Sequence, residues 1–561
     1  MQHPSIVTLN DITFTYPNAP ESLFDGVSAS FPRGWSAVLG DNGIGKSTLM
    51  GLVRGSLHPD KGVIMPNPAH LVIGYCPQDV AVKPSNLTDF VADWSPEAIA
   101  IRNDMGLSDD WAYRYDTLSG GERKRVQIAC ALALHPDVMI LDEPTNHVDA
   151  GTWRRIVAAM QQYRGIGIVV SHDADLIDQT CERCIVFTRR HIGSRNVTVA
   201  ETYQGGYSQA ASQIEAKHAA ESARMDAARR ETARLQAVKT QRFAKVRQVE
   251  AIKRAGGRYA NPKDHDARNA RQLARMTGLD RSVTRAYSQL DGRIAASQQR
   301  EAGLSVAAKR YDGDIWMDIE PSHRREIIRL EPCVIRFDLS GATAVADTNN
   351  GHSRVSADRL CHATLINGRV HVSLPSHRNG NGGSEDTDDR HRNADGMVPD
   401  NPEGLAAGLI SIGPCDHVAV TGPNGVGKST LLCAMLTHAA TVPRLVIAQN
   451  TSDEDASHAM MWLDALSVAD RASVLSAYAQ LNADPDRLIG GRSPSPGELR
   501  KLLLCLALPQ RPQLIVMDEP TNHLDLTSKK ALARLLRDYP GALIVVSHDE
   551  WFLRSAGFPV E

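Results

Sequence analysis

The nine residues Gly40–Thr48, which spell Gly-Asp-Asn-Gly-Ile-Gly-Lys-Ser-Thr, decide the fold, and Gly422–Thr430 repeats them as Gly-Pro-Asn-Gly-Val-Gly-Lys-Ser-Thr. Both copies have the spacing GxxxxGK[ST]. In this pattern the glycines let backbone N–H groups wrap around phosphate oxygens, and the lysine adds a cation. The repeat therefore predicts two nucleotide sites. Their candidate contacts are Gly40, Asn42, Gly43, Gly45, Lys46, Ser47 and Thr48, and Gly422, Asn424, Gly425, Gly427, Lys428, Ser429 and Thr430.

A short apolar run that ends in two acids follows each loop. Val138–Glu143 and Leu514–Glu519 both continue as Pro-Thr-Asn-His. A continuous apolar run is typical of a strand buried in a parallel sheet, where ligands bind at the carboxyl ends of the strands. We therefore predict an α/β fold for each repeat.

The acids at the ends of these runs fit two tasks. The first acid of each pair is placed to complete the environment of a Mg²⁺ ion, with a hydroxyl from the loop. The candidate Mg²⁺ ligands are Ser47, Gln78, Asp142, Ser429, Gln449 and Asp518. The second acids, Glu143 and Glu519, are placed to orient and deprotonate an attacking water as general bases.

A second apolar strand, Ile166–Val170 or Ala542–Val546, ends in Ser-His-Asp in both halves. This spacing places His172 and His548 at equivalent edges of the two sheets, where an imidazole can contact the terminal phosphate of a nucleotide. We predict that these histidines and the two strand-end glutamates are the catalytic residues.

The stretch Leu118–Glu122 has a different task. Its serine fits a helix N-cap and its glutamate closes a capping box, while the glycines expose donors to an anion. In the counterpart, Pro496 replaces one glycine, which the first helical position tolerates because its N–H has no partner within the helix. We expect both helix starts to bind phosphate in trans, through Ser119, Gly120, Gly121 and Glu122, and through Ser495, Gly497 and Glu498.

Between the repeats, residues 207 to 310 are rich in Ala, Arg, Gln and Glu, with apolar residues at three- and four-residue steps. This pattern predicts two long helices that turn near Gly256, Gly257 and Pro262. From residue 217 to 310 there are 22 Lys/Arg against 9 Asp/Glu, a local charge of +13, although the whole chain carries −3. A helical segment with this positive charge is expected to bind the phosphate backbone of a nucleic acid. Its candidate RNA contacts are Arg254, Arg258, Tyr259, Lys263, His265 and Arg268.

The composition and the start of the chain limit the class of protein to which the sequence can belong. A hydrophobic content of 42% is ordinary for a globular protein, and no run approaches the roughly 20 apolar residues of a membrane helix. The start of the chain lacks a secretory pattern, so we expect a cytoplasmic protein. Cys181 and Cys184 have no second pair with which to bind zinc, and we expect buried thiols. The polar segment near 376–400 cannot bury enough apolar surface to order itself.

The order of phosphate loop, Gln, Ser-Gly-Gly-Glu, Asp-Glu and His resembles the ATP-binding cassette superfamily, twice over. Two cassettes joined by a helical linker are similar to the ABC-F subclass, whose members act on ribosomes. The resemblance implies an ATPase that uses ATP and Mg²⁺ and closes as an intramolecular sandwich. In such a sandwich Lys46 and Glu143 face Ser495, and the second loop faces Ser119.

The resemblance also implies the organisation and the role. We expect a first cassette at 1–205, a basic helical hairpin at 206–320 and a second cassette at 321–561. The partners would be the ribosome, with its rRNA, and the P-site tRNA, which the linker approaches from the E site; we expect a monomer without a transmembrane partner. Hydrolysis to ADP and phosphate would release the protein. Translation regulation and antibiotic resistance by ribosome protection both fit.

One departure concerns the adenine. Tyr16 lies 24 residues before the first loop, a suitable place for an aromatic ring that stacks on adenine in this superfamily. The second cassette has no aromatic residue between Phe337 and its loop, so its adenine contact stays unassigned.

Three alternatives stay open. The first is an ATPase subunit of a membrane transporter, although the 40 residues between Gln78 and Leu118 leave little space for the larger helical subdomain it would need. The second is a DNA-maintenance ATPase, whose coiled arms usually lie within a cassette. The third is a ribosome-binding scaffold with vestigial hydrolysis, which Pro496 supports and the two glutamates oppose.

Overall fold

The computed structural model describes residues 4–17, 22–107, 109–146, 148–192, 195–255, 289–300, 315, 319–337, 344–346, 360–374, 404–449, 451–490 and 493–559. It divides into two units, one of residues 1–187, 200–208 and 310–561, the other of residues 188–199 and 209–309. The first unit holds both repeats, which we call the first cassette (before residue 207) and the second cassette (from residue 319). The segment 376–400 lies outside the described residues, as do the tip candidates from Arg258 to Arg268.

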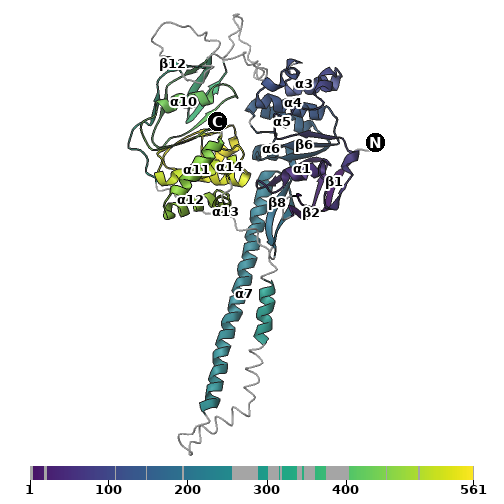
Figure 1. Ribbon diagram of the computed structural model, residues 1–561, viewed down its shortest axis with the longest axis vertical. Coiled ribbons are helices and arrows are strands. Elements are labelled where there is room, and N and C mark those ends of the chain that lie inside the picture. Colours follow the sequence, from purple (N-terminus) through teal and green to yellow (C-terminus); the bar gives the residue numbers. More distant parts are fainter. Residues whose placement is uncertain are drawn as a thin grey trace, which may run out of the picture. The chain divides into compact units, whose positions relative to one another are not determined.

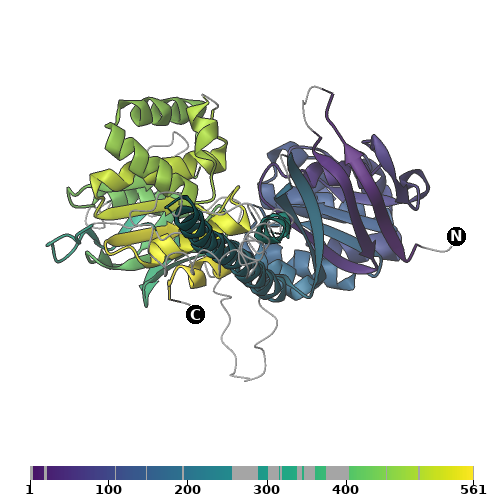
Figure 2. The same cartoon turned by 90° about the horizontal axis from the view of Figure 1, so that it is seen from below.

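The first cassette contains two sheets that share one core. A six-stranded sheet has the order β5 (Ile73–Cys76), β6 (Val138–Asp142), β7 (Ile166–Val170), β3 (Gly34–Gly40), β8 (Cys181–Ile192), β9 (Arg195–Gln204). A three-stranded antiparallel sheet has the order β2 (Phe24–Pro32), β1 (Ile6–Phe14), β4 (Lys61–Met65). Figure 2 shows β1 and β2 beside the larger sheet, and buried residues of both sheets form one apolar cluster.

The helices of the first cassette follow the strands of the six-stranded sheet (Figure 1). They are α1 (Lys46–Val53), α2 (Leu87–Ala92), α3 (Pro96–Met105), α4 (Gly120–Leu132), α5 (Ala150–Gln162) and α6 (Ala174–Thr180), with short 3-10 turns at Pro68–His70, Asp109–Ala112 and Tyr115–Thr117. Cys181 and Cys184 lie in β8 as buried free thiols, which confirms the prediction for this pair.

The second cassette has one nine-stranded sheet. Its order is β12 (Ala344–Ala346), β11 (Cys333–Arg336), β15 (Gly404–Ala407), β13 (Leu360–Ile366), β14 (Arg369–Ser373), β17 (His417–Thr421), β20 (Ala542–Val546), β19 (Leu514–Asp518), β18 (Arg444–Ile447). β10 (Ile328–Leu330) pairs separately with β16 (Ile410–Ile412). The parallel part, from β14 to β18, matches the order of β8, β3, β7, β6 and β5 in the first cassette.

Helices on the second sheet complete the fold. They are α10 (Lys428–Thr437), α11 (Asp453–Ala465), α12 (Val468–Gln480), α13 (Pro485–Ile489), α14 (Pro496–Ala507), α15 (Leu526–Arg537) and α16 (Glu550–Ser555), with a 3-10 turn at Leu508–Gln510. Two apolar clusters hold them to the sheet.

The predicted buried strands are confirmed. Every residue of β6 and β19 is buried, and both strands lie between parallel neighbours. β7 and β20 have the predicted bounds. Each strand ends at the aspartate, so the catalytic candidate is the first residue of the following loop.

The linker begins with α7 (Tyr207–Ala255), a helix of 49 residues. At 1.5 Å per residue, it is about 73 Å long. The segment 289–300 is also helical, and Thr232 bonds to Ser297 while Lys239 pairs with Asp291. Because the partner number falls as the α7 number rises, the two helices run antiparallel. The turn predicted near Gly256, Gly257 and Pro262 lies outside the described residues, as does the side chain of Arg254.

Candidate nucleotide sites

Each phosphate loop joins a central parallel strand to a helix, β3 to α1 and β17 to α10. Three glycines of the first loop have positive φ angles: Gly40 at 153°, Gly43 at 76° and Gly45 at 109°. The second loop repeats these values closely, at 145°, 77° and 94°. Residues other than glycine rarely adopt such φ angles. The backbone of each loop therefore needs glycine at these three positions, as the sequence pattern has it.

The last glycine of each loop also has no room for a side chain. A Cβ atom on Gly45 would lie 2.7 Å from the Phe24 ring, and one on Gly427 would lie 2.5 Å from the Phe337 ring. The lysines next to them, Lys46 and Lys428, are bonded to the backbone of their own loops. Lys46 Nζ donates to Gly40 O at 2.7 Å, and Lys428 Nζ donates to Gly422 O at 2.9 Å. Both ammonium groups are therefore aimed into the loops.

The strand-end glutamates occupy an unusual backbone position. Glu143 and Glu519 have φ angles of 46° and 47°, which a non-glycine residue adopts only at a cost in free energy. In each case the N–H donates, at 2.8 Å, to the carbonyl of Val170 or Val546 on the neighbouring strand. Each glutamate therefore stays bonded to the sheet through its N–H, although its backbone departs from the strand conformation.

Burial changes the acidity of both glutamates. It raises the pKa of Glu143 and of Glu519 from 4.5 to about 7, although the nearby lysine ammonium in each loop opposes the change. A carboxyl whose pKa lies close to the working pH is suited to take a proton from water. The arrangement can therefore perform general-base chemistry in both cassettes.

The histidines lie beside these glutamates, and their predicted contact with a phosphate stays a prediction. His172 Nε2 is 3.4 Å from Glu143 Oε1, and His548 Nε2 is 3.5 Å from Glu519 Oε1. Burial, followed by the charge of Lys428, lowers the pKa of His548 to about 4. Burial likewise lowers the pKa of His172 well below 6.5. Both imidazoles are therefore neutral near pH 7, and each can offer one N–H and one lone pair.

The residues present fit a Mg²⁺–nucleotide complex. In the second cassette Ser429 Oγ donates to Asp518 Oδ2 at 2.7 Å, which places a hydroxyl and a carboxylate together next to the loop. Glu519 Oε1 is buried and has no hydrogen-bond partner within the described residues. Mg²⁺ is usually held by one or two such oxygen ligands together with phosphate oxygens and water. Glu519 Oε1 can therefore still accept a hydrogen bond, for example from a water molecule.

The helix starts at α4 and α14 form as predicted. Ser119 accepts a bond from the Glu122 N–H and gives its own N–H to the Glu122 carboxylate, and Ser495 and Glu498 repeat this capping box. Pro496 occupies the first helical position and disturbs neither bond. The N–H groups of Gly120 and Gly121 in α4, and of Gly497 in α14, take no part in these bonds and can therefore donate to an anion.

Two basic residues that we did not single out from the sequence hold the Gln segments. Lys124 Nζ donates to the carbonyls of Pro77 and Gln78, at 2.7 and 3.2 Å. Arg500, at the same place in α14, donates to Gln449 O and, at 2.7 Å, to Asn522 O. Their identical spacing from the capping glutamate was a usable signal. Each ties its helix to the segment that carries the candidate Gln side chain.

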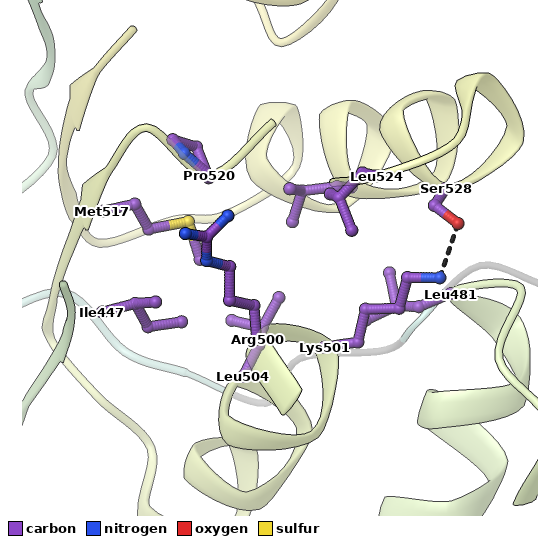
Figure 3. Close-up of a pocket in the computed structure, with 10 residues that line it drawn as sticks. Ile447, Leu481, Arg500, Lys501, Leu504, Met517, Pro520, Leu524 and Ser528 are labelled. Carbon is purple, nitrogen blue, oxygen red and sulfur yellow. Dashed lines mark hydrogen bonds between the residues drawn. The ribbon is translucent and has the colours of Figure 1, made fainter. Parts of the chain in front are cut away.

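Figure 3 shows the surroundings of Arg500, beside Lys501 and Met517. The cavity there has a volume of about 10 Å³, which is room for one water molecule at most. Arg500 Nε is buried and lacks a hydrogen-bond partner within the described residues. A single water could satisfy this atom, and the cavity is too small for a substrate.

The aromatic residues differ between the sites. Tyr16 is 44% exposed, and its hydroxyl lies 2.8 Å from Thr48 Oγ1 at the start of α1. In the second cassette Phe337 follows β11 and lies against Gly427. Aligning Leu9 with Leu330 brings Tyr16 and Phe337 to the same place, so this ring could have been found from the sequence.

Two hydrogen bonds join the first phosphate loop to the second cassette. Asn42 Nδ2 donates to His523 O at 3.0 Å, and Asn482 Nδ2 lies 3.5 Å from Asp41 Oδ1. The equivalent Asn424 bonds to His548 of its own cassette, at 2.9 Å.

The fold and the two sites define a P-loop nucleotide hydrolase with two nucleotide-binding domains in one chain. A family model described as "ABC transporter" matches residues 24–146 and 410–522. A putative ABC transporter ATP-binding protein of Nitratidesulfovibrio vulgaris is 31% identical over 217 residues, which are 33% of this chain and 80% of that protein. The chain therefore belongs to the ATP-binding cassette family, and it is an ATPase.

Two further similarities cover almost the whole chain. Ribosome protection protein VmlR of Bacillus subtilis is 25% identical over 568 residues, 98% of this chain and 85% of that protein. The solved structure titled RNase-L Inhibitor has a TM-score of 0.51 at 14% identity and covers 98% of this chain and 86% of that one, so it shows a shared twin-cassette fold. The two cassettes and the helix between them group the chain with the ABC-F subclass. No helix in the part of the chain that the structure describes is both long and apolar enough to cross a membrane.

Proposed function

We propose that the protein binds ribosomes in an ATP-dependent manner and that its cassettes close on two ATP molecules. The observation that carries this proposal is α7, a 49-residue helix between two complete cassettes. It contains 11 Lys/Arg against 5 Asp/Glu, and such a surface gains affinity for folded RNA through its phosphates. Similarity to a ribosome protection protein over 98% of the chain supports the same function.

The chemistry of each site follows from its own residues. Lys46 or Lys428 would bind the terminal phosphates. The Mg²⁺ ion would be held by Ser47 with Asp142, and by Ser429 with Asp518, the candidate glutamines Gln78 and Gln449 lying near it. When bound, the ion neutralises phosphate oxygens.

Hydrolysis would depend on the strand-end glutamates. Glu143 or Glu519 takes a proton from a water molecule that attacks the γ-phosphate, giving ADP and phosphate. His172 or His548, neutral and 3.4–3.5 Å from the glutamate, is placed to contact the same phosphate. Loss of that phosphate removes the ligand that holds the cassettes together, and the protein leaves the ribosome.

The finer part of the proposal concerns where the protein acts. As a member of the ABC-F subclass it would occupy the ribosomal E site in the cytoplasm, as a monomer, with the linker directed at the P-site tRNA and the peptidyl-transferase centre. Translation regulation and antibiotic resistance by ribosome protection are both compatible with this position. The tip candidates, from Arg254 to Arg268, stay predictions.

Co-sedimentation with ribosomes tests the proposal. The Glu143→Gln, Glu519→Gln double variant should pellet with ribosomes in ATP and stay in solution without it, because it closes without hydrolysing. Removing residues 240–275 should abolish pelleting, whereas removing residues 376–400 should leave it unchanged. Pelleting with duplex DNA but not with ribosomes would indicate a DNA-maintenance ATPase instead. Binding to neither would favour the ATPase subunit of a transporter.

A further inference from the structure

Position four after the aspartate that caps α5 or α15 differs between the cassettes. It is Trp153 in α5 and Lys529 in α15, counted from Asp149 and Asp525. Both side chains bond to the aspartate that follows the catalytic histidine. Trp153 Nε1 donates to Asp173 Oδ2 and Lys529 Nζ donates to Asp549 Oδ2, each at 2.7 Å. The two residues thus have one shared task, although only lysine carries a charge.

Lys529 has a second bond that leaves its own cassette. Its Nζ donates to the backbone carbonyl of His172 in the first cassette, at 2.9 Å. The lysine is only 7% exposed. The Trp153 indole has a single N–H, which it already gives to Asp173, so it has no donor left for the carbonyl of His548. At this position, the only described side-chain bond between the cassettes is therefore the one from Lys529 to the first site.

The ammonium group of Lys529 also lies among several carboxylates and offsets their negative charge. Burial disfavours it, yet carboxylates outweigh burial and raise the pKa of Lys529. These carboxylates belong to Asp549, Asp173 and Glu143. Asp173 is partly buried; desolvation raises its pKa, and the charge of Asp549 raises it further, so the two aspartates repel each other. Without the lysine, two carboxylates from opposite cassettes would meet with no cation between them.

We propose that Lys529 is a positioning residue that acts in trans on the first ATP site. Its ammonium group fixes the His172 backbone and lets Asp173 and Asp549 approach each other when the cassettes dock. His172 lies 3.4 Å from Glu143, so its placement affects the base that activates water. The first site consequently depends on docking of the second cassette through a contact that the second site lacks.

Steady-state ATPase measurements without ribosomes test the proposal, independently of ribosome binding. In the Glu519→Gln background the second site lacks its general base, so the measured kcat is that of the first site. In the Glu143→Gln background the measured kcat is that of the second site. Lys529→Met should lower kcat about tenfold in the first background and change it less than about twofold in the second, with a smaller effect on the KM for ATP in both. Lys529→Arg keeps the charge and should recover most of the activity. Lys530→Met, in the same helix, is the matched control and should have no effect.

A second variant separates positioning from folding. Asp549→Asn combined with Lys529→Met removes the stranded charge, and asparagine still caps α16. The double variant should regain the thermal stability of the wild type, while kcat of the first site stays low. Equal loss of activity in both backgrounds, no loss in the first, or recovery of kcat together with stability would each overturn the proposal.

Discussion

Replacing Glu143 with glutamine should stabilise the nucleotide-free protein at pH 8 and have no effect on stability at pH 4. Burial raises the pKa of this carboxyl from 4.5 to about 7. As the pH rises past 4.5, the unfolded chain ionises first, so the folded state loses stability until the pH passes about 7 and then stays constant. A pKa difference of about 2.5 corresponds to about 3 kcal/mol. Glutamine cannot ionise and avoids this loss, while its carbonyl can still accept the His172 N–H.

The assay is thermal unfolding between pH 4 and pH 8, without nucleotide or Mg²⁺. For a domain of the size of one cassette, about 3 kcal/mol corresponds to an increase of about 6–12 °C in Tm at pH 8. Glu97→Gln, at the exposed start of α3, is the control and should change Tm by less than about 1 °C, as surface substitutions usually do. A Tm gain that is the same at pH 4 and pH 8, or no gain at pH 8, would refute the assignment of a buried and destabilised carboxylate.

Three further outcomes are expected. Arg500→Met should slow hydrolysis and destabilise the second cassette by roughly 3 kcal/mol, because buried carbonyls lose their donor; kinetics and denaturant unfolding both report it. Gly427→Ala should destabilise the nucleotide-free protein by about 2–4 kcal/mol, since strain adds to the clash with Phe337, whereas Gly425→Ala has open space and should cost about 1–2 kcal/mol. Chelation with EDTA should abolish hydrolysis and leave the Tm of the nucleotide-free protein unchanged, as calorimetry can verify.

Much of the site was predictable because its chemistry demands particular residues at fixed spacing. Glycines with positive φ, a serine cap with glutamate three residues later, and a buried apolar strand are local patterns with local causes. The strands β6, β7, β19 and β20 appeared where the apolar runs predicted them. A side chain whose partner lies within its own loop or helix can therefore be placed from the sequence.

Features that depend on distant partners were not predictable in this way. The positive φ of Glu143 arises because its N–H bonds to Val170 on another strand. The identical spacing of Lys124 and Arg500 from the capping glutamates marks them as equivalent, but only the fold shows that they hold the Gln segments. Phe337 can be matched with Tyr16 by aligning the two sequences, but its contact with Gly427 is visible only in the fold.

The two ATP sites have the same catalytic residues, but the residues around them differ. This difference affects how each site responds to bound ATP. Arg125 bonds within the first cassette, to the carbonyls of Met105 and Gly106, whereas the equivalent Lys501 bonds to Ser528 at the start of α15. The same helix carries Lys529, which reaches His172. A displacement of α14 when it binds phosphate would therefore be passed through α15 to the first site. Among the described residues, Arg125 has no hydrogen bond to α5, the helix equivalent to α15. We therefore expect ATP in the first site to affect His172 more strongly than ATP in the second site affects His548.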